Sequence, residues 1–515
     1  MKSFHKSLCL VAVLLATCWS PSVTAQPAAY QELHRPQFHF TPAINWMNDP
    51  NGMVYYDGEY HLFYQYNPFG DKWGHMSWGH AVSPDLVHWE HLPLALAEEN
   101  GVMIFSGSAV VDWKNTSGFG KDGKAPLVAI YTGHYSEKPL QNQQIAFSND
   151  RGRTWTKYEG NPVLDIGLKD FRDPKVMWDE RTGQWVMTVS MPTDRKVRFY
   201  GSPNLKDWTL LSEFGPAGSV KGIWECPDLF QVAIEGSDRS KWVLIVNIGG
   251  ESVAGGSGCQ YFVGEFDGRE FKSDDNDPTA VHWVDYAKDF YAAVSWADVP
   301  ESDGRRLWLG WMSNWEYAND VPTTPWRSAM SIPRTLSLRK VDGDWRLLQQ
   351  PVVELEKLRV ADSGGQFSYE SSGENSTLEN NFGNLGQTYE LVADIRASKD
   401  AVFSLEFCRG DGEGTVLRFD LASETVTLDR TQSGVVDFSD RFPSVFTAPV
   451  RRIKGGVRVH AFVDTSSIEI FINDGETVLT TLVLPKPDSN GLQLKAGEGV
   501  KSTQVTTWKL NSAWR

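Results

Sequence analysis

Short apolar runs recur along the first two thirds of the chain at nearly constant spacing. Their centres, at Leu62, Val128, Val186, Leu244 and Trp308, are 66, 58, 58 and 64 residues apart. Each run has the length of a β-strand, turns rich in Gly and Pro separate the runs, and no long stretch has the period of a helix. Five units of about 60 residues are typical of a propeller whose blades are four-stranded sheets. We therefore predict a five-bladed β-propeller over residues 31–350.

A second element repeats out of phase with the first. Each copy begins with Ser, continues through polar turn residues and ends in Trp. This pattern predicts a turn that leads into an outer strand carrying the Trp. The three copies are residues 83–89, 148–155 and 202–208.

The last third of the chain has a different period. Residues 388–395 and 467–472 alternate in polarity, and the second run is followed by the turn sequence Asn473-Asp474-Gly475. Alternating strands without crossover helices predict an antiparallel β-sandwich over residues 362–515. Residues 351–361 are predicted to be a linker, which contains the best helical candidate of the chain. The expected fold class is therefore all-β, a five-bladed β-propeller followed by a C-terminal antiparallel β-sandwich.

The N-terminus has the pattern of an export signal. Lys2 and Lys6 precede an apolar run over residues 8–16, and Val23-Thr24-Ala25 provides a small-residue cleavage site. We predict that residues 1–25 are a signal peptide and that the protein is secreted, or periplasmic in a bacterium. Lipidation at Cys18 is a less favoured alternative, because Thr17 stands where a smaller residue is usual. No later run approaches ~20 uncharged apolar residues, so no membrane span is expected.

Composition narrows the possible partners. The 515 residues include 49 Lys and Arg against 65 Asp and Glu, a net charge of -16 that disfavours nucleic acid and anionic membranes. Aromatic residues make up 12% of the chain, including 21 Trp, which suits stacking on sugar rings but more often reflects a β-rich core. Cys226, Cys259 and Cys408 remain after signal removal, and their wide spacing does not indicate a disulfide framework. The sequence leaves the oligomeric state open.

Three of the five units begin with an acid near a proline, just before the strand-like run. The acids are Asp49, Asp173 and Glu225, and Arg172 precedes the second of them. The innermost strands of a propeller line its axis, so we expect these acids to occupy equivalent positions and to face one another. A carboxylate cluster of this kind suits glycoside hydrolysis, which needs one proton donor and one nucleophile or base. The alternative, that each pair is only a turn signal, does not explain three acids in register.

The sequence resembles glycoside hydrolase family 32, the β-fructofuranosidases that include invertases, exo-inulinases and levanases. The resemblance covers nearly the whole mature chain, and the segments around the three acids are its most specific part. The matching motifs are WMNDPNG at 46–52, FYQYNP at 63–68, WGH at 78–80, FSG at 105–107, FRDP at 171–174, WECPD at 224–228, DFYA at 289–292 and WMSNWEY at 311–317.

This resemblance implies a retaining mechanism and a set of site residues. Asp49 is implied to be the nucleophile, Glu225 the general acid and base, and Asp173 the stabiliser of the transition state. Exo-acting release of fructose from inulin, levan or sucrose is likewise an implication of the family. The implied substrate contacts are Asn48, Gln65, Trp73, Ser106, Arg172 and Trp315.

Residues near these motifs receive simpler interpretations. We expect Trp46 to wall the sugar pocket together with Trp73, and Cys226 to have a packing role. His75, His80 and His134 lack the spacing of metal ligands and are interpreted as structural. No metal and no cofactor are expected.

Two other functions stay open. A fructosyltransferase would form the same covalent intermediate and pass it to a sugar hydroxyl instead of water. A carbohydrate-binding homologue would hold sugar without cutting it, although the presence of all three acids argues against this. The sequence does not rank inulin, levan and sucrose. The sandwich is interpreted as packing support for the propeller, with polymer binding as the alternative.

Overall fold

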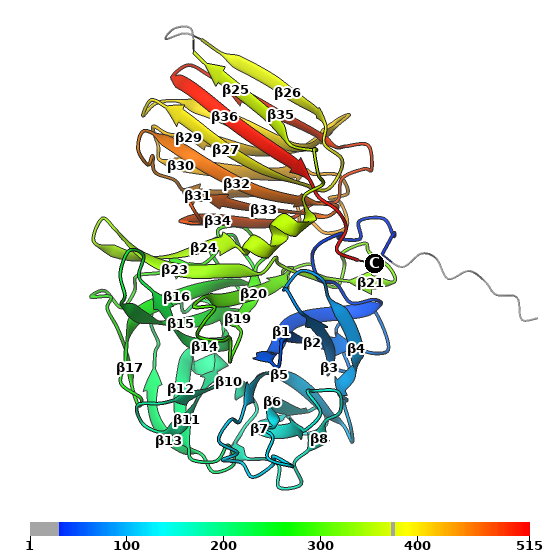
Figure 1. The fold of residues 1–515 in the computed structure, drawn as a ribbon, viewed down its shortest axis with the longest axis vertical. Helices are drawn as coiled ribbons and strands as arrows, with labels where there is room; N and C mark the ends of the chain where they lie inside the picture. The colour runs from blue at the N-terminus through cyan, green and yellow to red at the C-terminus, as the bar shows by residue number, and fades with distance from the viewer. Residues whose placement is uncertain (1–29, 372–375, 515) are drawn as a thin grey trace, which may run out of the picture.

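The computed structural model describes residues 30–371 and 376–514, so the predicted signal peptide lies outside the described residues. Five sheets form the N-terminal part of the molecule, and they are antiparallel apart from the short parallel pair of β1 and β21 in the first sheet (Figure 1). The first contains β1 (Asn45–Tyr56), β2 (Glu59–Asn67), β3 (Ser77–Ser83) and β4 (Glu90–Leu96), with β21 (Trp326–Arg327) beside β1. The second contains β5 (Val102–Val111), β6 (Leu127–Tyr135), β7 (Leu140–Ser148), β8 (Thr156–Lys157) and β9 (Leu164–Leu168).

The other three blades follow in chain order. The third contains β10 (Arg172–Asp179), β11 (Gln184–Met191), β12 (Lys196–Ser202) and β13 (Thr209–Phe214), with the 3-10 helix η1 (Pro192–Asp194) between β11 and β12. The fourth contains β14 (Trp224–Ala233), β15 (Ser240–Ile248), β16 (Gly258–Phe266), β17 (Phe271–Ser273) and β18 (His282–Trp283). The fifth contains β19 (Tyr291–Ser295), β20 (Arg306–Met312), β22 (Ala329–Met330), β23 (Arg334–Val341) and β24 (Asp344–Pro351).

The first strand of each sheet lies at the centre of the ring. Each of these strands contacts the next one, in the order β1, β5, β10, β14 and β19, and β19 contacts β1. The ring is closed by a backbone hydrogen bond of 2.9 Å from the Tyr55 N–H to the Ala297 carbonyl. The five sequence units are therefore five blades, and the predicted propeller is confirmed.

The Ser-to-Trp repeats form one local structure in three blades. In the first copy the Asp85 N–H donates to Ser83 Oγ, and the Trp89 indole donates to the Leu86 carbonyl at 3.1 Å. The indoles of Trp155 and Trp208 make the same bond three residues back along the chain. Each repeat leads into the outer strand of its blade, β4, β8 or β13, as predicted, but each Trp lies one residue before the strand and not in it.

The C-terminal part is a sandwich of two six-stranded sheets. The segment predicted as helical forms a 3-10 helix, η2 (Val353–Leu358), instead of an α-helix. One sheet contains β25 (Gly365–Glu370), β36 (Val500–Lys509), β27 (Tyr389–Ala397), β32 (Gly456–Asp464), β33 (Ser467–Ile472) and β34 (Thr477–Leu482). The other contains β26 (Leu378–Asn384), β35 (Gly491–Ala496), β28 (Val402–Gly410), β29 (Glu413–Asp420), β30 (Thr425–Gln432) and β31 (Val445–Pro449).

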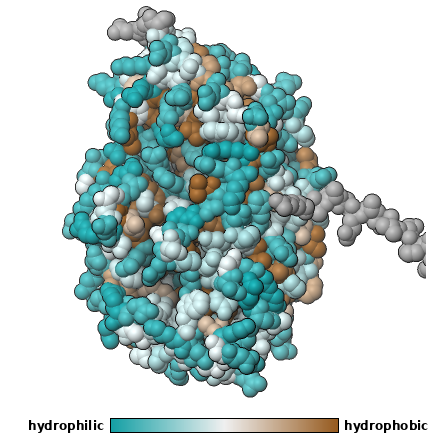
Figure 2. Space-filling model, in the orientation of Figure 1, coloured by the Kyte–Doolittle hydropathy of each residue, from teal (hydrophilic) through white to brown (hydrophobic). Residues whose placement is uncertain are grey.

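The sandwich packs on the fifth blade through β33 and β34, which lie nearest the propeller in Figure 1. Every residue of these two strands is buried, because one face lies in the sandwich core and the other on the propeller. Ile470 belongs to the sandwich core, whereas its neighbour Phe471 packs in a propeller cluster. The outer face of the molecule shown in Figure 2 is mainly hydrophilic, with scattered hydrophobic residues.

Candidate active site

A β-bulge interrupts the innermost strand of every blade at the same level. Two residues of the first strand oppose one residue of the second, which turns side chains away from the ladder and toward the axis. The bulges lie between Met47 and Pro50, Ile104 and Gly107, Arg172 and Lys175, Glu225 and Asp228, and Tyr291 and Val294.

The three acids take three successive positions around this bulge. Glu225 is the last paired residue before it, Asp173 is the first bulged residue, and Asp49 is the second. The prediction that the acids occupy equivalent positions is therefore wrong. Relative to the bulge, Glu225 lies one position before Asp173, and Asp49 lies one position after it. Asp49 and Asp173 each stand 13 residues before the centre of the following run, Leu62 or Val186. The spacing is equal in spite of the offset because β1 has a second bulge at Gly52, where φ is 53° and a Cβ would lie 2.5 Å from the Phe63 ring. The acids nevertheless converge, because they come from different blades at nearly one level.

All nine predicted site residues line one pocket of about 340 Å³. They come from four of the five innermost strands, from β2 and from two loops. The pocket is lined by Asn48, Asp49, Gln65, Trp73, Ser106, Arg172, Asp173, Glu225 and Trp315, together with Phe105, His134 and Gln141.

Asp49 is held by donors on both of its carboxylate oxygens. Ser106 Oγ donates to Oδ2 at 2.7 Å, and Asn48 Nδ2 donates to Oδ1 at 3.0 Å. Asn48 is itself fixed by the indole of Trp46, which donates to Asn48 Oδ1 at 2.7 Å. Burial raises the pKa of Asp49, while the bonds from Ser106 and Asn48 act in the opposite direction.

Glu225 is fixed by two neighbours, one on each carboxylate oxygen. The Arg172 guanidinium donates to Oε1 from Nη2 at 2.9 Å and from Nε at 3.1 Å. The Tyr291 hydroxyl donates to Oε2 at 2.5 Å. Arg172, Glu225 and Tyr291 occupy the same position before the bulge in three consecutive blades, so the contacts follow from the propeller symmetry.

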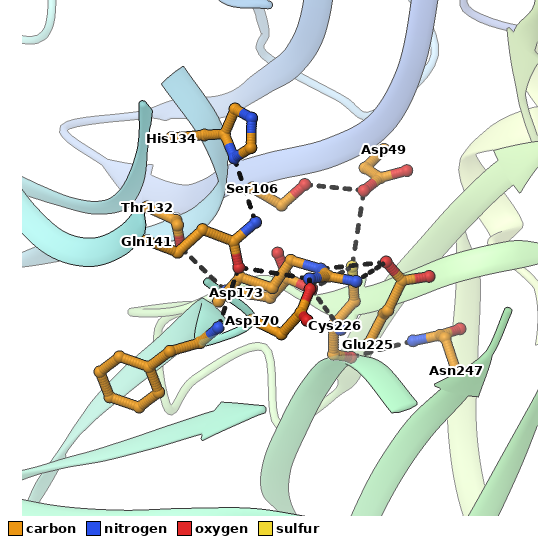
Figure 3. Close-up of polar contacts among 12 residues, drawn as sticks. Asp49, Ser106, Thr132, His134, Gln141, Asp170, Asp173, Glu225, Cys226 and Asn247 are labelled. Carbon is orange, nitrogen blue, oxygen red and sulfur yellow. Dashed lines mark hydrogen bonds and ion pairs between the residues drawn. The ribbon is translucent and has the colours of Figure 1, made fainter. Parts of the chain in front are cut away.

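Asp173 and Cys226 are joined at the floor of the pocket. The Cys226 N–H donates to Asp173 Oδ2 at 2.9 Å, and its thiol lies 3.6 Å from the same oxygen and 3.5 Å from Asp49 Oδ2 (Figure 3). Burial raises the pKa of Asp173, with Arg172 opposing and Glu225 adding to the shift. Three carboxyl groups thus share the pocket with one cation, Arg172, which favours at least one bound proton.

Known protein families match both parts of the chain. The Glycosyl hydrolases family 32 N-terminal domain matches residues 39–351, and the Glycosyl hydrolases family 32 C terminal domain matches residues 354–509. The chain belongs to glycoside hydrolase family 32. It is therefore a glycoside hydrolase, and the resemblance inferred from the motifs is confirmed.

Individual members of family 32 are similar over nearly the whole chain. A levanase of Bacillus subtilis (strain 168) is 49% identical, and the match covers 100% of this chain and 76% of the levanase. An extracellular exo-inulinase of Aspergillus ficuum is 41% identical over 94% of this chain and 96% of its own length. The crystal structure of an exo-inulinase from Aspergillus awamori superposes with a TM-score of 0.89 at 39% identity, covering 94% of this chain and 100% of that one.

Several residues of this family 32 pocket differ from their sequence interpretation. Trp46 is fully buried and lies behind the pocket, its ring centroid 6.1 Å from that of Trp315, so its assignment to the pocket wall is wrong. Cys226 is buried as expected but touches two of the acids. His134 lines the pocket, stacked on Phe105 with 4.4 Å between ring centroids.

Tyr291 and Gln141 were missed as site residues. Gln141 Oε1 accepts from Arg172 Nη1 at 3.2 Å and so orients the guanidinium that binds Glu225. The DFYA motif contained Tyr291, but its contact with Glu225 crosses from one blade to the next. Tyr291 and Glu225 occupy the same position before their bulges, but this equivalence is visible only in the strand pairing and gave no signal in the sequence.

Proposed function

We propose that this protein releases terminal β-D-fructose from the fructans inulin and levan, and from sucrose. The observation that carries the proposal is one pocket in which Asp49 and Glu225 stand together with all the predicted sugar contacts. The names of the similar proteins, levanase and exo-inulinase, point to the two fructans. Exo action is supported by the name of one similar protein, an extracellular exo-inulinase.

Asp49 would act as the nucleophile of a retaining double displacement. Its carboxylate oxygen forms a bond to the anomeric carbon of the fructosyl unit while the glycosidic C–O bond breaks. The donors Ser106 and Asn48 favour the ionised carboxylate that this attack requires. These two hydrogen bonds also fix the orientation of the Asp49 carboxylate.

Glu225 would supply and then recover the proton. As a neutral acid it protonates the departing oxygen, and as a carboxylate it then takes a proton from water. The water oxygen bonds to the anomeric carbon, Asp49 leaves as a carboxylate, and fructose is released with its configuration retained. Arg172 and Tyr291 hold the two oxygens of Glu225 separately, which orients the carboxyl group for this exchange.

Asp173 would bind hydroxyl groups of the fructosyl unit and stabilise the positive charge of the transition state. The Cys226 N–H holds Asp173 Oδ2, and the Thr132 hydroxyl accepts the Asp173 N–H at 2.9 Å. These bonds fix both the backbone and the side chain. Asn48, Gln65 and Arg172 offer further polar groups to the sugar, while Trp73 and Trp315 offer aromatic faces.

The rival activities differ in where the fructosyl group goes. A transferase would pass it to a sugar hydroxyl, so at high sucrose concentration oligosaccharides would outpace free fructose throughout. A sugar-binding protein would release nothing. We favour hydrolysis because the relatives named above are hydrolases.

We propose that the protein works outside the cytoplasm. Its first 25 residues have the pattern of a signal peptide, and one relative is named an extracellular exo-inulinase. The substrate would then be a neutral saccharide in solution, with no role for nucleic acid or a membrane surface.

Sugar release from sucrose, inulin and levan tests the proposal, with Asp49→Ala and Glu225→Ala beside the unmutated protein. Fructose alone from the polymers, and losses of roughly 10³-fold or more in both variants, would support it. Short oligosaccharides as first products would agree with the proposed site but would show that the enzyme is endo-acting. Binding without release would show a sugar-binding module, and an inverted anomer on NMR would reject the retaining mechanism.

A further inference from the structure

A fully buried arginine of the sandwich reaches into the propeller close to the pocket. Arg430 on β30 donates from Nη1 to Asp289 Oδ2 at 2.6 Å and from Nη2 to the Tyr317 hydroxyl at 2.9 Å. Within the sandwich, its Nε donates to the Phe442 carbonyl at 2.8 Å, and its guanidinium carbon lies 4.0 Å from the centre of the Phe442 ring. The guanidinium is thus fixed in its own domain and presents two donors to the other.

The three side chains form a closed hydrogen-bonded triangle. The Tyr317 hydroxyl donates to Asp289 Oδ1 at 2.5 Å, which completes the contacts of Arg430 with both residues. The backbone N–H of Leu482, also in the sandwich, donates to Asp289 Oδ2 at 2.9 Å. Every member of the triangle is buried, so the charges of Arg430 and Asp289 compensate each other without solvent.

Each propeller member of the triangle stands two residues along the chain from a residue that lines the pocket or is hydrogen-bonded to one that does. Asp289 precedes Tyr291, whose hydroxyl holds Glu225. Tyr317 follows Trp315, which lines the pocket.

The two segments are also tied to each other beside the triangle. Asn314 Nδ2 donates to the Lys288 carbonyl at 2.9 Å, and Lys288 Nζ donates to Glu316 Oε2 at 2.7 Å. Residues 288–291 and 314–317 therefore form one unit. Arg430 connects this unit to the sandwich through the triangle, and Lys288 Nζ adds a bond to the Arg441 carbonyl at 2.8 Å.

We propose that Arg430 is a positioning residue of the active site, acting through Asp289 on Tyr291 and through Tyr317 on Trp315. The sandwich thereby contributes to turnover as well as to folding. The inference rests on the proposed function, because its test measures the release of fructose from sucrose. A displaced Tyr291 would weaken the orientation of Glu225, and a displaced Trp315 would weaken the hold on the sugar.

A second buried arginine at the same interface provides a matched control. Arg334 on β23 is also fully buried and donates to Glu469 Oε2 of the sandwich at 2.5 Å. It also donates to Gln349 Oε1 at 2.8 Å and to Thr480 Oγ1 at 2.7 Å, and none of these three residues lines the pocket. Its guanidinium carbon lies 4.1 Å from the centre of the Phe290 ring, an apolar contact that a Met side chain can keep. Loss of either arginine removes a buried interdomain ion pair, but only Arg430 donates hydrogen bonds to residues of the 288–291 and 314–317 unit.

The test compares Arg430→Met with Arg334→Met in the full chain. Both are expected to lower the melting temperature. Arg430→Met should also lower kcat/KM on sucrose by roughly 10- to 100-fold, with a higher KM, whereas Arg334→Met should stay within about threefold of the unmutated enzyme. Equal kcat and equal KM values in the two variants would overturn the proposal.

Tyr317→Phe provides a second test if Arg430→Met does not fold. It removes only the hydroxyl that joins Arg430 to Asp289 and keeps the ring, so it should lower kcat/KM in the same direction by a smaller factor. A Tyr317→Phe enzyme with unchanged KM and kcat would reject the proposal. Failure of the proposed function itself would look different, because the unmutated protein would then release no fructose. In that case the dissociation constant for fructose replaces KM, and it should rise in Arg430→Met alone.

Discussion

Ser106 and Asp49 occupy the same second position of the bulge in the neighbouring strands β5 and β1, and the Ser106 hydroxyl lies 2.7 Å from Asp49 Oδ2. The bulge thus places a neutral donor beside the predicted nucleophile from the next blade. Burial favours the protonated form of Asp49, and this bond favours the ionised form that attack requires.

Ser106→Ala should therefore move the acid limb of kcat/KM to higher pH. Loss of the donor raises the pKa of Asp49 further, so a larger fraction of the enzyme carries a protonated nucleophile at mildly acidic pH. One hydrogen bond to a charged group corresponds to a shift of about one pH unit. Profiles of kcat/KM for sucrose between about pH 3 and 8 provide the measurement.

Ser108→Ala is the matched control for this shift. Ser108 lies two residues further along β5, is equally buried, and its Oγ accepts the Val176 N–H at 3.0 Å outside the pocket. Its removal should affect stability but leave the acid limb in place. A limb that does not move in Ser106→Ala would show that another group sets it.

The stability of the pocket should depend on the charge of Asp173. Burial raises its folded pKa, so the carboxyl group contributes stability that is present below its unfolded pKa and lost as pH rises through the folded value. Asp173→Asn resembles the protonated form. The variant should be inactive and about 1 to 2 kcal/mol more stable than the unmutated protein at pH 7, with the difference vanishing near pH 3.5.

Thermal unfolding at both pH values measures this difference. Asp394→Asn is the control, because Asp394 is half exposed and pairs with Arg458 on the surface, where a change within about 0.5 kcal/mol is expected. If Asp173→Asn is less stable than the unmutated protein at pH 7, its bonds to Cys226 outweigh the burial of its charge.

Most of the fold and of the candidate site could be predicted from the repeat pattern of the sequence. Five equal units predicted five blades, and the acids near prolines predicted the pocket, because a propeller brings the same level of each blade to one axis. The position of each acid within its bulge could not be predicted. A bulge adds one residue to a strand, and the second bulge of β1 at Gly52 cancelled the offset between Asp49 and Asp173 in the sequence.

Contacts between distant segments of the chain also could not be predicted from the sequence. Tyr291 reaches Glu225 across 66 positions, and Arg430 reaches Tyr317 across 113. The local pattern around each residue gives no sign of its partner. Such pairs depend on how blades and sandwich are placed in space, whereas strands and turns depend on neighbouring residues.

The three described cysteines should be unreactive in the folded protein. Cys226, Cys259 and Cys408 are buried and unpaired, and burial raises the pKa of each thiol, to about 12 for Cys408. The thiolate is the reactive form, so little of it exists at pH 8. Iodoacetamide at pH 8 should leave these three residues unmodified and activity unchanged, whereas labelling in urea should modify all three. Inactivation of the folded enzyme with modification at Cys226 would show that the pocket floor opens in solution.

Stability in alkaline solution should depend on His39 at the interface between propeller and sandwich. Its Nδ1 lies 2.7 Å from Asp464 Oδ2 and its Nε2 lies 2.9 Å from Glu469 Oε1. Burial alone would lower the pKa of His39, but the bonds to these two carboxylates raise it to about 9.

A histidine whose folded pKa is raised contributes stability that is complete below its unfolded pKa and lost as pH rises through the folded value. The contribution of His39 should therefore be full at pH 6 and largely gone at pH 10, a loss of roughly 3 kcal/mol. Urea unfolding of the unmutated protein and of His39→Asn, between pH 6 and 10, measures this loss. The variant should be less stable at pH 6, because Asp464 and Glu469 lose their shared cation, and the two proteins should converge as pH rises. Parallel pH profiles for the two proteins would show that His39 is not the group that titrates, and Arg334 would then be the cation that compensates the charge of Glu469.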